Sequence, residues 1–505
     1  MSTSSTDSFD LVETTVADIH AAMADGHVTA EALVDRYLTR IEVYDTDLNA
    51  VLTVNDNARG RAHELDKQFE NDGFTGPLHG IPVALKDNQD TQDMPTTAGS
   101  VALAESTPPR DAYVVAQLRA AGAIVVAKTN LQELSFGLDT ISSLGGATRN
   151  AYKLDYRPSG SSGGTAAALA ANLATLGTGS DTCSSLRSPP AFNNLVGVRP
   201  TGGLVSRTVI VPLSETQDTA GPVARTVADA ARVLEVIAGN DPADPATASA
   251  EDRVPKEGYR SHLDPDGLEG ARIGVVRQFF GLQSEDSATA TDAAKVTSVV
   301  EEAIDAMGAT GATVVDPVEV VDVGLLESAR VIEYEFARDF GRYLSELGDA
   351  TPHDSLADIY ETGTITPSVE SRLESSDILE IDIASLDENA DYLRRLRRQH
   401  QLAETTLSRL DERDIDALLY PPSAIPPVEF PHHQPFSEMN CELSAHTGLP
   451  AIVVPAGFTE DGLPVGVELL GRRFAEPRLF ELAYNFEQTT DHRRPPERFG
   501  ELERK

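Results

Sequence analysis

Two serine-rich clusters lie close together in the chain and contain residue types that could do covalent chemistry. The first reads Ser-Gly-Ser-Ser-Gly-Gly over residues 159–164, and the second reads Asp-Thr-Cys-Ser-Ser-Leu-Arg over residues 181–187. Ser and Gly side chains fill no core, so such loops instead present hydroxyls and backbone N–H groups at close range. The pair of clusters suits a hydroxyl nucleophile with N–H donors beside it.

Two other interpretations of the first cluster fit the sequence less well. A phosphate-binding loop would continue with Gly-Lys-Ser/Thr, and no lysine follows Gly164. A flexible Ser/Gly linker would not run directly into an apolar segment, whereas residues 165–176 are uncharged and rich in Ala and Leu, which predicts a buried helix. The hydroxyl interpretation still requires a base, and none is adjacent in the sequence.

The lysines are candidates for that base because they are scarce. Lysine accounts for 7 of the 41 basic residues, so it is avoided where a generic cation would serve. Lys86 and Lys128 each end an apolar run that predicts a buried strand, and open α/β sheets bind ligands at such strand ends. Each could instead be a paired or snorkelling structural lysine, and spacing does not choose between them.

Six motifs resemble those of the amidase signature family of serine hydrolases and occur in the family's order over about residues 10–490. They are Gly-Ile-Pro-Val-Ala-Leu-Lys-Asp-Asn (80–88), Gly-Ser-Ser-Gly-Gly (160–164), Asp-Thr-x-x-Ser-Leu-Arg-x-Pro (181–189), Gly-Val-Arg-Pro-Thr-x-Gly-Leu-Val-Ser (197–206), Asp-Thr-Ala-Gly-Pro-Val-Ala-Arg-Thr-Val-x-Asp (218–229) and Gly-Leu-Pro-Ala-Ile-Val-Val-Pro-Ala-Gly (448–457). The resemblance implies an amidase that needs neither a metal nor a cofactor.

The resemblance also implies a Ser, cis-Ser, Lys triad. The nucleophile falls on Ser185, the bridging serine on Ser161 after a cis peptide bond from Gly160, and the base on Lys86, which leaves Lys128 a structural role. Lysine must be neutral to act as a base, and lowering its pKa from about 10.4 to about 7 disfavours the ammonium by roughly 4–5 kcal/mol. Burial at an apolar strand end can supply that.

The remaining site residues implied by the resemblance surround the nucleophile. The tetrahedral oxyanion would accept hydrogen bonds from the backbone N–H groups of Ser185 and the three residues before it, and three further side chains support the loops. The oxyanion donors are Thr182, Cys183 and Ser184, and the supporting residues are Ser162, Asp181 and Arg187. Asp181 and Arg187 would either pair across the loop and fix its shape or form a solvated ion pair.

One departure from the family's pattern concerns the residues immediately before Ser185. Many members have Gly-Gly there, whereas this chain has Cys183-Ser184. If either position required a positive φ, the substitution would strain the loop or move an oxyanion donor. Cys183 is a rival nucleophile, but no histidine partner is recognisable nearby, so a small side chain tolerated in the loop is the better interpretation.

Strand patterns alternate with helix patterns from Gly80 onward, which predicts βαβ units. At 505 residues, with motifs in both halves, the chain is expected to form one large α/β domain. Its central sheet is expected to be mixed and mostly parallel, with helices on both faces. The predicted boundaries are a disordered lead at 1–8, the amidase domain at 9–495 with a variable substrate-covering region at about 325–435, and a C-terminal tail at 496–505.

Composition restricts the partners and the compartment. A net charge of −39 argues against nucleic acid and anionic membranes as partners, and with scarce lysine it is typical of proteins from salt-loving microbes. Two cysteines, Cys183 and Cys441, make no disulfide framework and suit a reducing cytosol. No apolar run approaches 18 residues, so a cytoplasmic protein is expected. The adjacent His432 and His433 lack a third ligand in metal-binding spacing and are interpreted as exposed loop residues.

Three functions therefore remain. The first is an amidase acting on a small-molecule amide, with a homodimer as one assembly the sequence allows. The second is the glutaminase subunit of a tRNA amidotransferase, whose typical Phe-Asp-Gly-Val-Arg-Tyr-Gly motif is absent from the region 325–347. The third is a binding protein that keeps the fold with an oxyanion loop disabled at Cys183-Ser184.

Overall fold

An 11-stranded sheet runs through the molecule and brings the serine clusters and Lys86 to its strand ends. The computed structural model describes residues 9–281 and 287–502, so the predicted lead at 1–8 lies outside the described residues. In spatial order the strands are β1 (Val51–Val54), β3 (Ile124–Thr129), β2 (Pro82–Lys86), β6 (Leu176–Asp181), β8 (Thr219–Ala224), β7 (Val196–Arg199), β12 (Ala451–Phe458), β13 (Pro464–Leu470), β11 (Ala417–Tyr420), β9 (Arg272–Val275) and β10 (Thr313–Val315). A separate two-stranded ribbon pairs β4 (Ile141–Ser142) with β5 (Gly146–Ala147).

The sheet is mixed, and its parallel pairs gather in two flanks. β2 runs parallel to both β3 and β6, and β9 runs parallel to both β10 and β11. Antiparallel ladders through β8, β7, β12 and β13 join the two flanks, and β1 adds antiparallel to β3. The predicted α/β class with a mixed sheet is confirmed. β2 and β3 are buried along their whole length, as expected for apolar strands covered on both faces.

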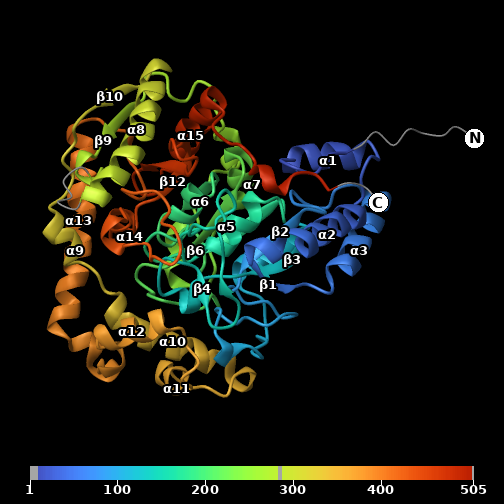
Figure 1. Ribbon diagram of the computed structural model, residues 1–505, viewed down its shortest axis with the longest axis horizontal. Helices are drawn as coiled ribbons and strands as arrows, with labels where there is room; N and C mark the ends of the chain where they lie inside the picture. Colours follow the sequence, from blue (N-terminus) through green and yellow to red (C-terminus); the bar gives the residue numbers. More distant parts are fainter. Residues whose placement is uncertain (1–8, 282–286, 503–505) are drawn as a thin grey trace, which may run out of the picture.

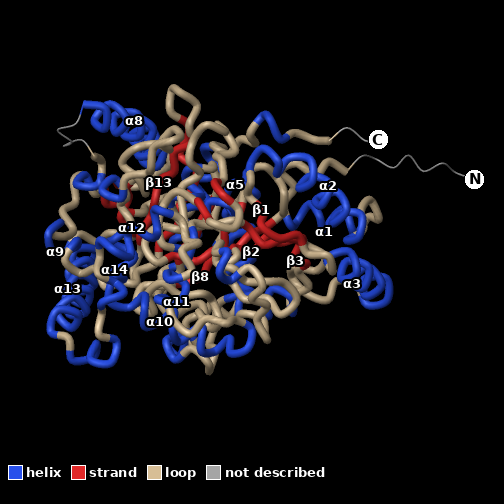
Figure 2. The backbone as a smooth tube through the Cα atoms, turned by 60° about the horizontal axis from the view of Figure 1, so that its bottom comes forward, coloured by secondary structure: helices blue, strands red, loops and turns tan. Residues whose placement is uncertain are grey.

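Helices cover both faces of this sheet (Figures 1 and 2). They are α1 (Val16–Ala24), α2 (Ala30–Leu48), α3 (Ala58–Asp72), α4 (Tyr113–Ala120), α5 (Gly163–Ala170), α6 (Ser188–Phe192), α7 (Val227–Ile237), α8 (Ser287–Ala309), α9 (Val323–Glu327), α10 (Ile332–Leu347), α11 (Leu356–Glu361), α12 (Pro367–Ser375), α13 (Ala390–Glu412), α14 (Glu442–Thr447) and α15 (Glu476–Thr490). Thr15 and Asp18 form the capping box that starts α1, with the Asp18 N–H donating to Thr15 Oγ1 at 3.2 Å.

The buried helix predicted over 165–176 is too long, which is a correction with a local cause. α5 ends at Ala170, and the chain turns at Asn172, whose φ of 56° lies in the left-handed region that Asn tolerates. Asn172 Oδ1 also accepts a hydrogen bond from the Glu13 N–H at 2.8 Å. The turn lets the chain re-enter the sheet as β6, which carries Ser180 and Asp181 into the site.

A second apolar cluster lies under α10, α11 and α12, which group together at one end of the molecule (Figure 1). Phe336 and Phe340 of α10 and Leu373 of α12 pack with Phe136 and Leu213, which come from loops beside the serine clusters. Helices from the region predicted to be variable therefore contact the loops around the site.

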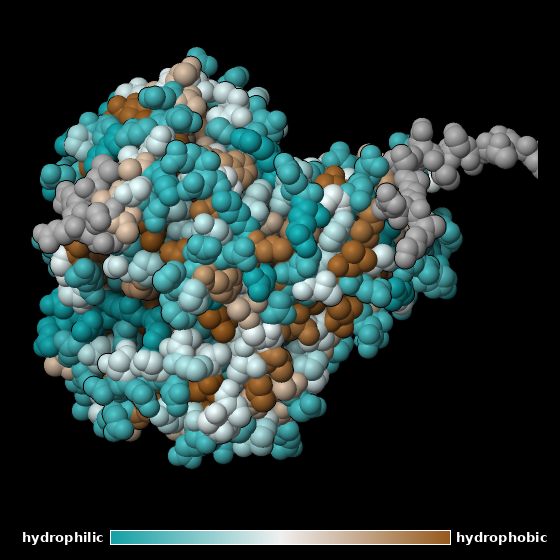
Figure 3. All heavy atoms as spheres, viewed as in Figure 1, coloured by the Kyte–Doolittle hydropathy of each residue, from teal (hydrophilic) through white to brown (hydrophobic). Residues whose placement is uncertain are grey.

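The outer surface is dominated by hydrophilic side chains on the face drawn in Figure 3. This agrees with the net charge of −39. Across residues 9–281 and 287–502, no helix is both long and apolar enough to cross a membrane.

Near the C-terminus Phe499 is buried, and Arg40 of α2 donates to the Phe499 and Gly500 carbonyl oxygens.

Candidate active site

Lys86 is the last residue of β2, and its side chain is fully buried. The Nζ atom donates to Ser161 Oγ at 2.7 Å and to Ser180 Oγ at 2.9 Å. No carboxylate among the described residues lies within ion-pair distance of it. Burial lowers the pKa of Lys86 to about 7, and the carboxylates of Asp181 and Asp218 oppose this shift. A substantial fraction of Lys86 is therefore neutral near neutral pH.

Ser161 bridges Lys86 and Ser185. Its Oγ donates to Ser185 Oγ at 2.9 Å, and its backbone N–H donates to the same atom at 2.8 Å. The Gly160–Ser161 peptide bond is cis, as the family resemblance implied. The three residues predicted as a triad thus lie in one hydrogen-bonded row, in the order Ser185, Ser161 and Lys86.

The backbone before Ser185 offers free donors. Among the described residues, the N–H groups of Thr182, Cys183, Ser184 and Ser185 donate to no protein acceptor. Neither Cys183 nor Ser184 has a positive φ, so the condition under which replacing Gly-Gly would strain the loop is not met. The Thr182 hydroxyl donates to Asp218, and the Thr182 carbonyl accepts from Gln217 Nε2 at 3.1 Å.

Asp181 and Arg187 pair inside the protein, which excludes the solvated alternative. Arg187 Nε lies 3.2 Å from Asp181 Oδ2, and both side chains are at most 1% exposed. Arg187 also contacts Glu468 at 2.8 Å, and Arg199 contacts Asp181 at 2.8 Å. Because β6, β7 and β13 each contribute one charge, this network fixes the loop to three strands of the sheet.

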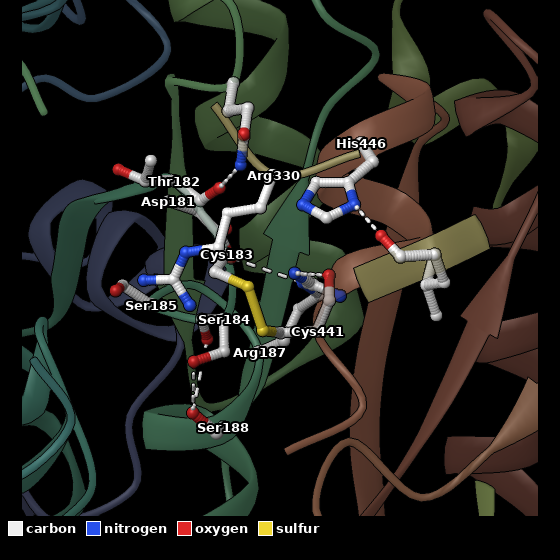
Figure 4. The surroundings of a disulfide bond; sticks show 12 residues. Asp181, Thr182, Cys183, Ser184, Ser185, Arg187, Ser188, Arg330, Cys441 and His446 are labelled. Carbon is white, nitrogen blue, oxygen red and sulfur yellow. Dashed lines mark hydrogen bonds and ion pairs between the residues drawn. A yellow bond between two sulfur atoms is a disulfide. The ribbon is translucent and has the colours of Figure 1, made fainter. Parts of the chain in front are cut away.

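The expectation that the two cysteines stay unpaired is wrong. Cys183 and Cys441 form a disulfide with a Cα–Cα distance of 5.0 Å, across 258 positions of sequence. Figure 4 shows the bond beside Ser184 and Ser185. The pairing also removes Cys183 as a rival nucleophile, because a disulfide sulfur has no thiolate to attack with.

Two hydrogen-bond partners of the row were missed from the sequence. Ser180 Oγ accepts from Lys86 and also from Asn88 Nδ2 at 2.8 Å. The predicted supporting residue Ser162 donates to the Ser180 carbonyl oxygen at 3.2 Å. The available signal was position, because Asn88 follows Lys86 by two residues and Ser180 directly precedes Asp181.

The other predicted candidates lie apart from the serines. Lys128 Nζ pairs with Asp87 Oδ1 at 2.9 Å, and both side chains are fully buried. His433 Nδ1 contacts Asp139 Oδ2 at 2.6 Å. Within the described part of the chain, no three His, Cys, Asp or Glu side chains cluster as metal ligands would.

Two cavities border the site. A small one of about 30 Å³ contains the nucleophile and is lined by Ser135, Phe136, Gly137, Leu138, Thr182, Cys183, Ser184, Ser185, Leu213, Arg330, Ile332, Arg372 and Phe436. A larger one of about 340 Å³ reaches Ser180 but not Ser185, and it shares Ser135, Thr182 and Leu213 with the first. We take the small cavity as the acyl site because it is the one that contains Ser185.

Two arginines line the small cavity. The Arg372 guanidinium stacks 4.3 Å from the centre of the Phe136 ring, and Arg330 lies 4.7 Å from that of Phe436. Arg330 pairs with Glu333, whereas Arg372 has no carboxylate partner among the described residues. Burial lowers the pKa of Arg372 to about 10, so it remains a cation at neutral pH.

Comparisons with known proteins agree with the family resemblance. The family model described as Amidase matches residues 32–480. A probable amidase of Arabidopsis thaliana is 34% identical over 97% of this chain and 92% of its own length. A glutamyl-tRNA(Gln) amidotransferase subunit from Alkaliphilus metalliredigens (strain QYMF) is 33% identical over 94% of this chain and 96% of its own. The crystal structure of native peptide amidase from Stenotrophomonas maltophilia superposes with a TM-score of 0.81 at 36% identity, covering 96% of this chain and 99% of the other.

Proposed function

The chain belongs to the Amidase family, whose members hydrolyse amide C–N bonds, and we propose that it converts a carboxamide to a carboxylate and ammonia or an amine through an acyl-enzyme on Ser185. One observation carries this mechanism. It is the hydrogen-bonded row from Ser185 through Ser161 to a buried Lys86 that pairs with no carboxylate in residues 9–281 and 287–502.

Acylation begins with neutral Lys86. Lys86 accepts a proton from Ser161 as Ser161 accepts one from Ser185, and Ser185 Oγ attacks the amide carbon. The free N–H groups of Cys183 and Ser184 then donate to the developing oxyanion, each worth on the order of 3–4 kcal/mol in comparable sites.

Proton transfer along the row from Ser185 to Lys86 then reverses. Protonated Lys86 returns its proton through Ser161 to the departing nitrogen, which leaves as ammonia or an amine. Water then attacks the acyl carbon and gives a proton to the same row. The bond from that carbon to Ser185 Oγ breaks, Ser185 takes the proton back from the row, and the carboxylic acid leaves. Within the row, each proton passes between side chains whose heavy atoms lie within 2.9 Å of each other in the free protein.

The lining of the small cavity supports a substrate with an anionic or aromatic group near its amide. Arg372 is a cation that pairs with no carboxylate in the described part of the chain, and Phe136 and Phe436 supply aromatic faces. With a volume of about 30 Å³ the small cavity is narrow, and these three side chains form part of its wall.

A glutaminase subunit of a tRNA amidotransferase is the second candidate. The Alkaliphilus metalliredigens relative is named as a subunit of such an enzyme, and Arg372 would suit the carboxylate of glutamine. Against it, residues 331–337 read Val-Ile-Glu-Tyr-Glu-Phe-Ala, where that subunit typically carries its own motif. Copurification with a second subunit, with glutamine as the preferred amide, would favour this candidate.

Ammonia release tests the proposal directly. Aliphatic amides, aromatic amides and glutamine would be assayed in concentrated KCl with wild type and Ser185→Ala, and circular dichroism would confirm that both are folded. We expect turnover by wild type and none by the variant. A folded wild type that binds amides without hydrolysing any of them would overturn the proposal in favour of a binding protein.

We also propose that the protein works in a salt-rich cytoplasm, as its acidic, lysine-poor composition suggests. A homodimer stays a prediction that size-exclusion chromatography with light scattering can test. Full activity in dilute buffer would argue against the salt-adapted interpretation.

A further inference from the structure

Cys183 occupies the middle of the proposed oxyanion loop, two residues before Ser185. Its neighbours in this loop are held by hydrogen bonds. The Thr182 side chain donates to Asp218, and the Ser184 carbonyl accepts from the N–H groups of Arg187 and Ser188 at 2.8 and 2.9 Å. Among the described residues, neither the N–H nor the carbonyl of Cys183 has a hydrogen-bond partner. Within the part of the chain that the structure describes, the disulfide to Cys441 is therefore the one polar or covalent cross-link of this residue.

This anchoring follows from what the loop has to do. N–H groups that bind an oxyanion must stay free in the resting protein, so the loop cannot be held by donating them to its own backbone. Side chains have to hold the loop instead. At residue 183 that side chain is the half-cystine, which lines the small cavity beside Ser185.

The other end of the disulfide is held firmly. Cys441 is fully buried and stands directly before α14. Its carbonyl accepts from Arg187 Nη2 at 3.1 Å, and Arg187 is itself fixed by Asp181 and Glu468. The disulfide thus connects the oxyanion loop back to the ion network at the loop's own base (Figure 4).

We propose that Cys441 is a positioning residue whose disulfide to Cys183 aligns the oxyanion donors, so that amide hydrolysis depends on the oxidation state of this bond. The inference rests on the proposed amidase function. Reduction would free Cys183 and let its N–H and that of Ser184 leave their positions, whereas Phe136 of the acyl site packs in a buried cluster that includes neither cysteine. The loss would therefore appear in kcat and not in KM.

The chemistry needs a dithiol reductant. Cys183 is 8% exposed and Cys441 is 0% exposed, so a thiolate of the reductant attacks Cys183 Sγ. The S–S bond breaks, and Cys441 leaves as a thiolate and takes up a proton. The second thiolate of the reductant then displaces Cys183, which also takes up a proton, and the reductant closes into a disulfide after giving up two electrons.

The test compares oxidised wild type, wild type reduced by dithiothreitol, and Cys441→Ser. Thiols would be counted by maleimide labelling after denaturation, and thermal melts would confirm folding at the assay temperature. We expect reduction to lower kcat by about 10- to 100-fold with KM within about twofold, and reoxidation to restore it. Cys441→Ser should have the kcat of the reduced wild type both with and without dithiothreitol. If Cys441→Ser does not fold, Cys183→Ser takes its place in the same comparison.

Equal kcat in the oxidised and reduced proteins, with two free thiols counted in the latter, would overturn this inference and leave the amidase proposal intact. Loss of activity that tracks unfolding would also overturn it, since the disulfide would then act on stability alone. If neither state hydrolyses any amide, the proposed function fails, and the inference fails with it.

Discussion

Lys86 and Lys128 form a natural comparison because both are fully buried near the ends of adjacent parallel strands, Lys86 as the last residue of β2 and Lys128 as the last but one of β3. Lys128 Nζ lies 2.9 Å from a carboxylate oxygen of Asp87, whereas Lys86 Nζ meets serine hydroxyls at 2.7 and 2.9 Å. Asp87 directly follows Lys86 in the turn that ends β2, and its carboxylate reaches the other lysine. Burial alone therefore does not make a base. A buried lysine needs hydroxyl partners in place of a carboxylate.

Removing the amine of Lys86 tests the catalytic half of the comparison and has the largest expected effect. Lys86→Met keeps a similar volume without a proton acceptor, so kcat/KM should fall by about 10²- to 10⁴-fold. The midpoint of thermal unfolding should not fall, because methionine needs no desolvation. Ammonia release and a melt measure both quantities, and activity within tenfold of wild type would contradict the assignment.

Removing the amine of Lys128 should instead affect stability. Lys128→Met leaves the buried Asp87 carboxylate without its cation, which costs about 3–5 kcal/mol of unfolding free energy. Activity per folded molecule should stay within about tenfold of wild type. Urea unfolding measures the loss, and the double variant with Asp87→Asn should recover part of it. A single variant as stable as wild type would show that the ion pair has no structural role.

Placing a carboxylate beside Lys86 should make it resemble Lys128. Ser180 Oγ now accepts a hydrogen bond from Lys86 Nζ at 2.9 Å. Ser180→Asp replaces this hydroxyl with a carboxylate, which stabilises the ammonium and raises the pKa of Lys86. The acidic limb of the pH profile of kcat/KM should then move from about 7 to higher pH. Ser180→Asn is the matched uncharged control, and an equal shift in both variants would refute the electrostatic explanation.

The smallest effect is expected at Asp218, whose carboxylate favours the charged form of Lys86 less than Asp181 does. Protonated Lys86 cannot accept a proton, so wild-type activity should be full above its pKa and be lost as pH falls through about 7. Asp218→Asn removes a charge that favours the ammonium, so this limb should move slightly to lower pH. A shift to higher pH would mean that another group controls the limb.

The same comparison shows what could be read from the sequence. Both lysines were found as strand-end residues, but composition and spacing left them equivalent, and only the family resemblance selected Lys86. The deciding contacts come from Ser180 on β6, which pairs with β2, and from Ser161 in the loop before α5. Ser180 was missed because the Ala-rich pattern of 165–176 predicted a longer helix and hid the turn at Asn172.

The α/β class, the mixed sheet and the family were predictable because apolar strand runs and motifs are local in sequence. The disulfide was not, because its cysteines lie 258 positions apart and two cysteines alone give no pairing signal. Only part of the buried ion network could be predicted from the sequence. Asp181 and Arg187 stand six positions apart, but Glu468 lies on β13 and carries no motif that links it to them.

The ion network also affects the order in which a working enzyme arises during synthesis. Lys86, Ser161 and Ser185 all emerge early, yet Arg187 obtains its second carboxylate from Glu468, which is 281 positions later. At roughly 5–20 residues per second, the ribosome takes about 15–60 s to cover that distance. A nascent chain that ends before Glu468 carries all three proposed catalytic side chains but lacks one charge that holds their loop. Activity should therefore begin only near the end of translation, after the whole sheet can close.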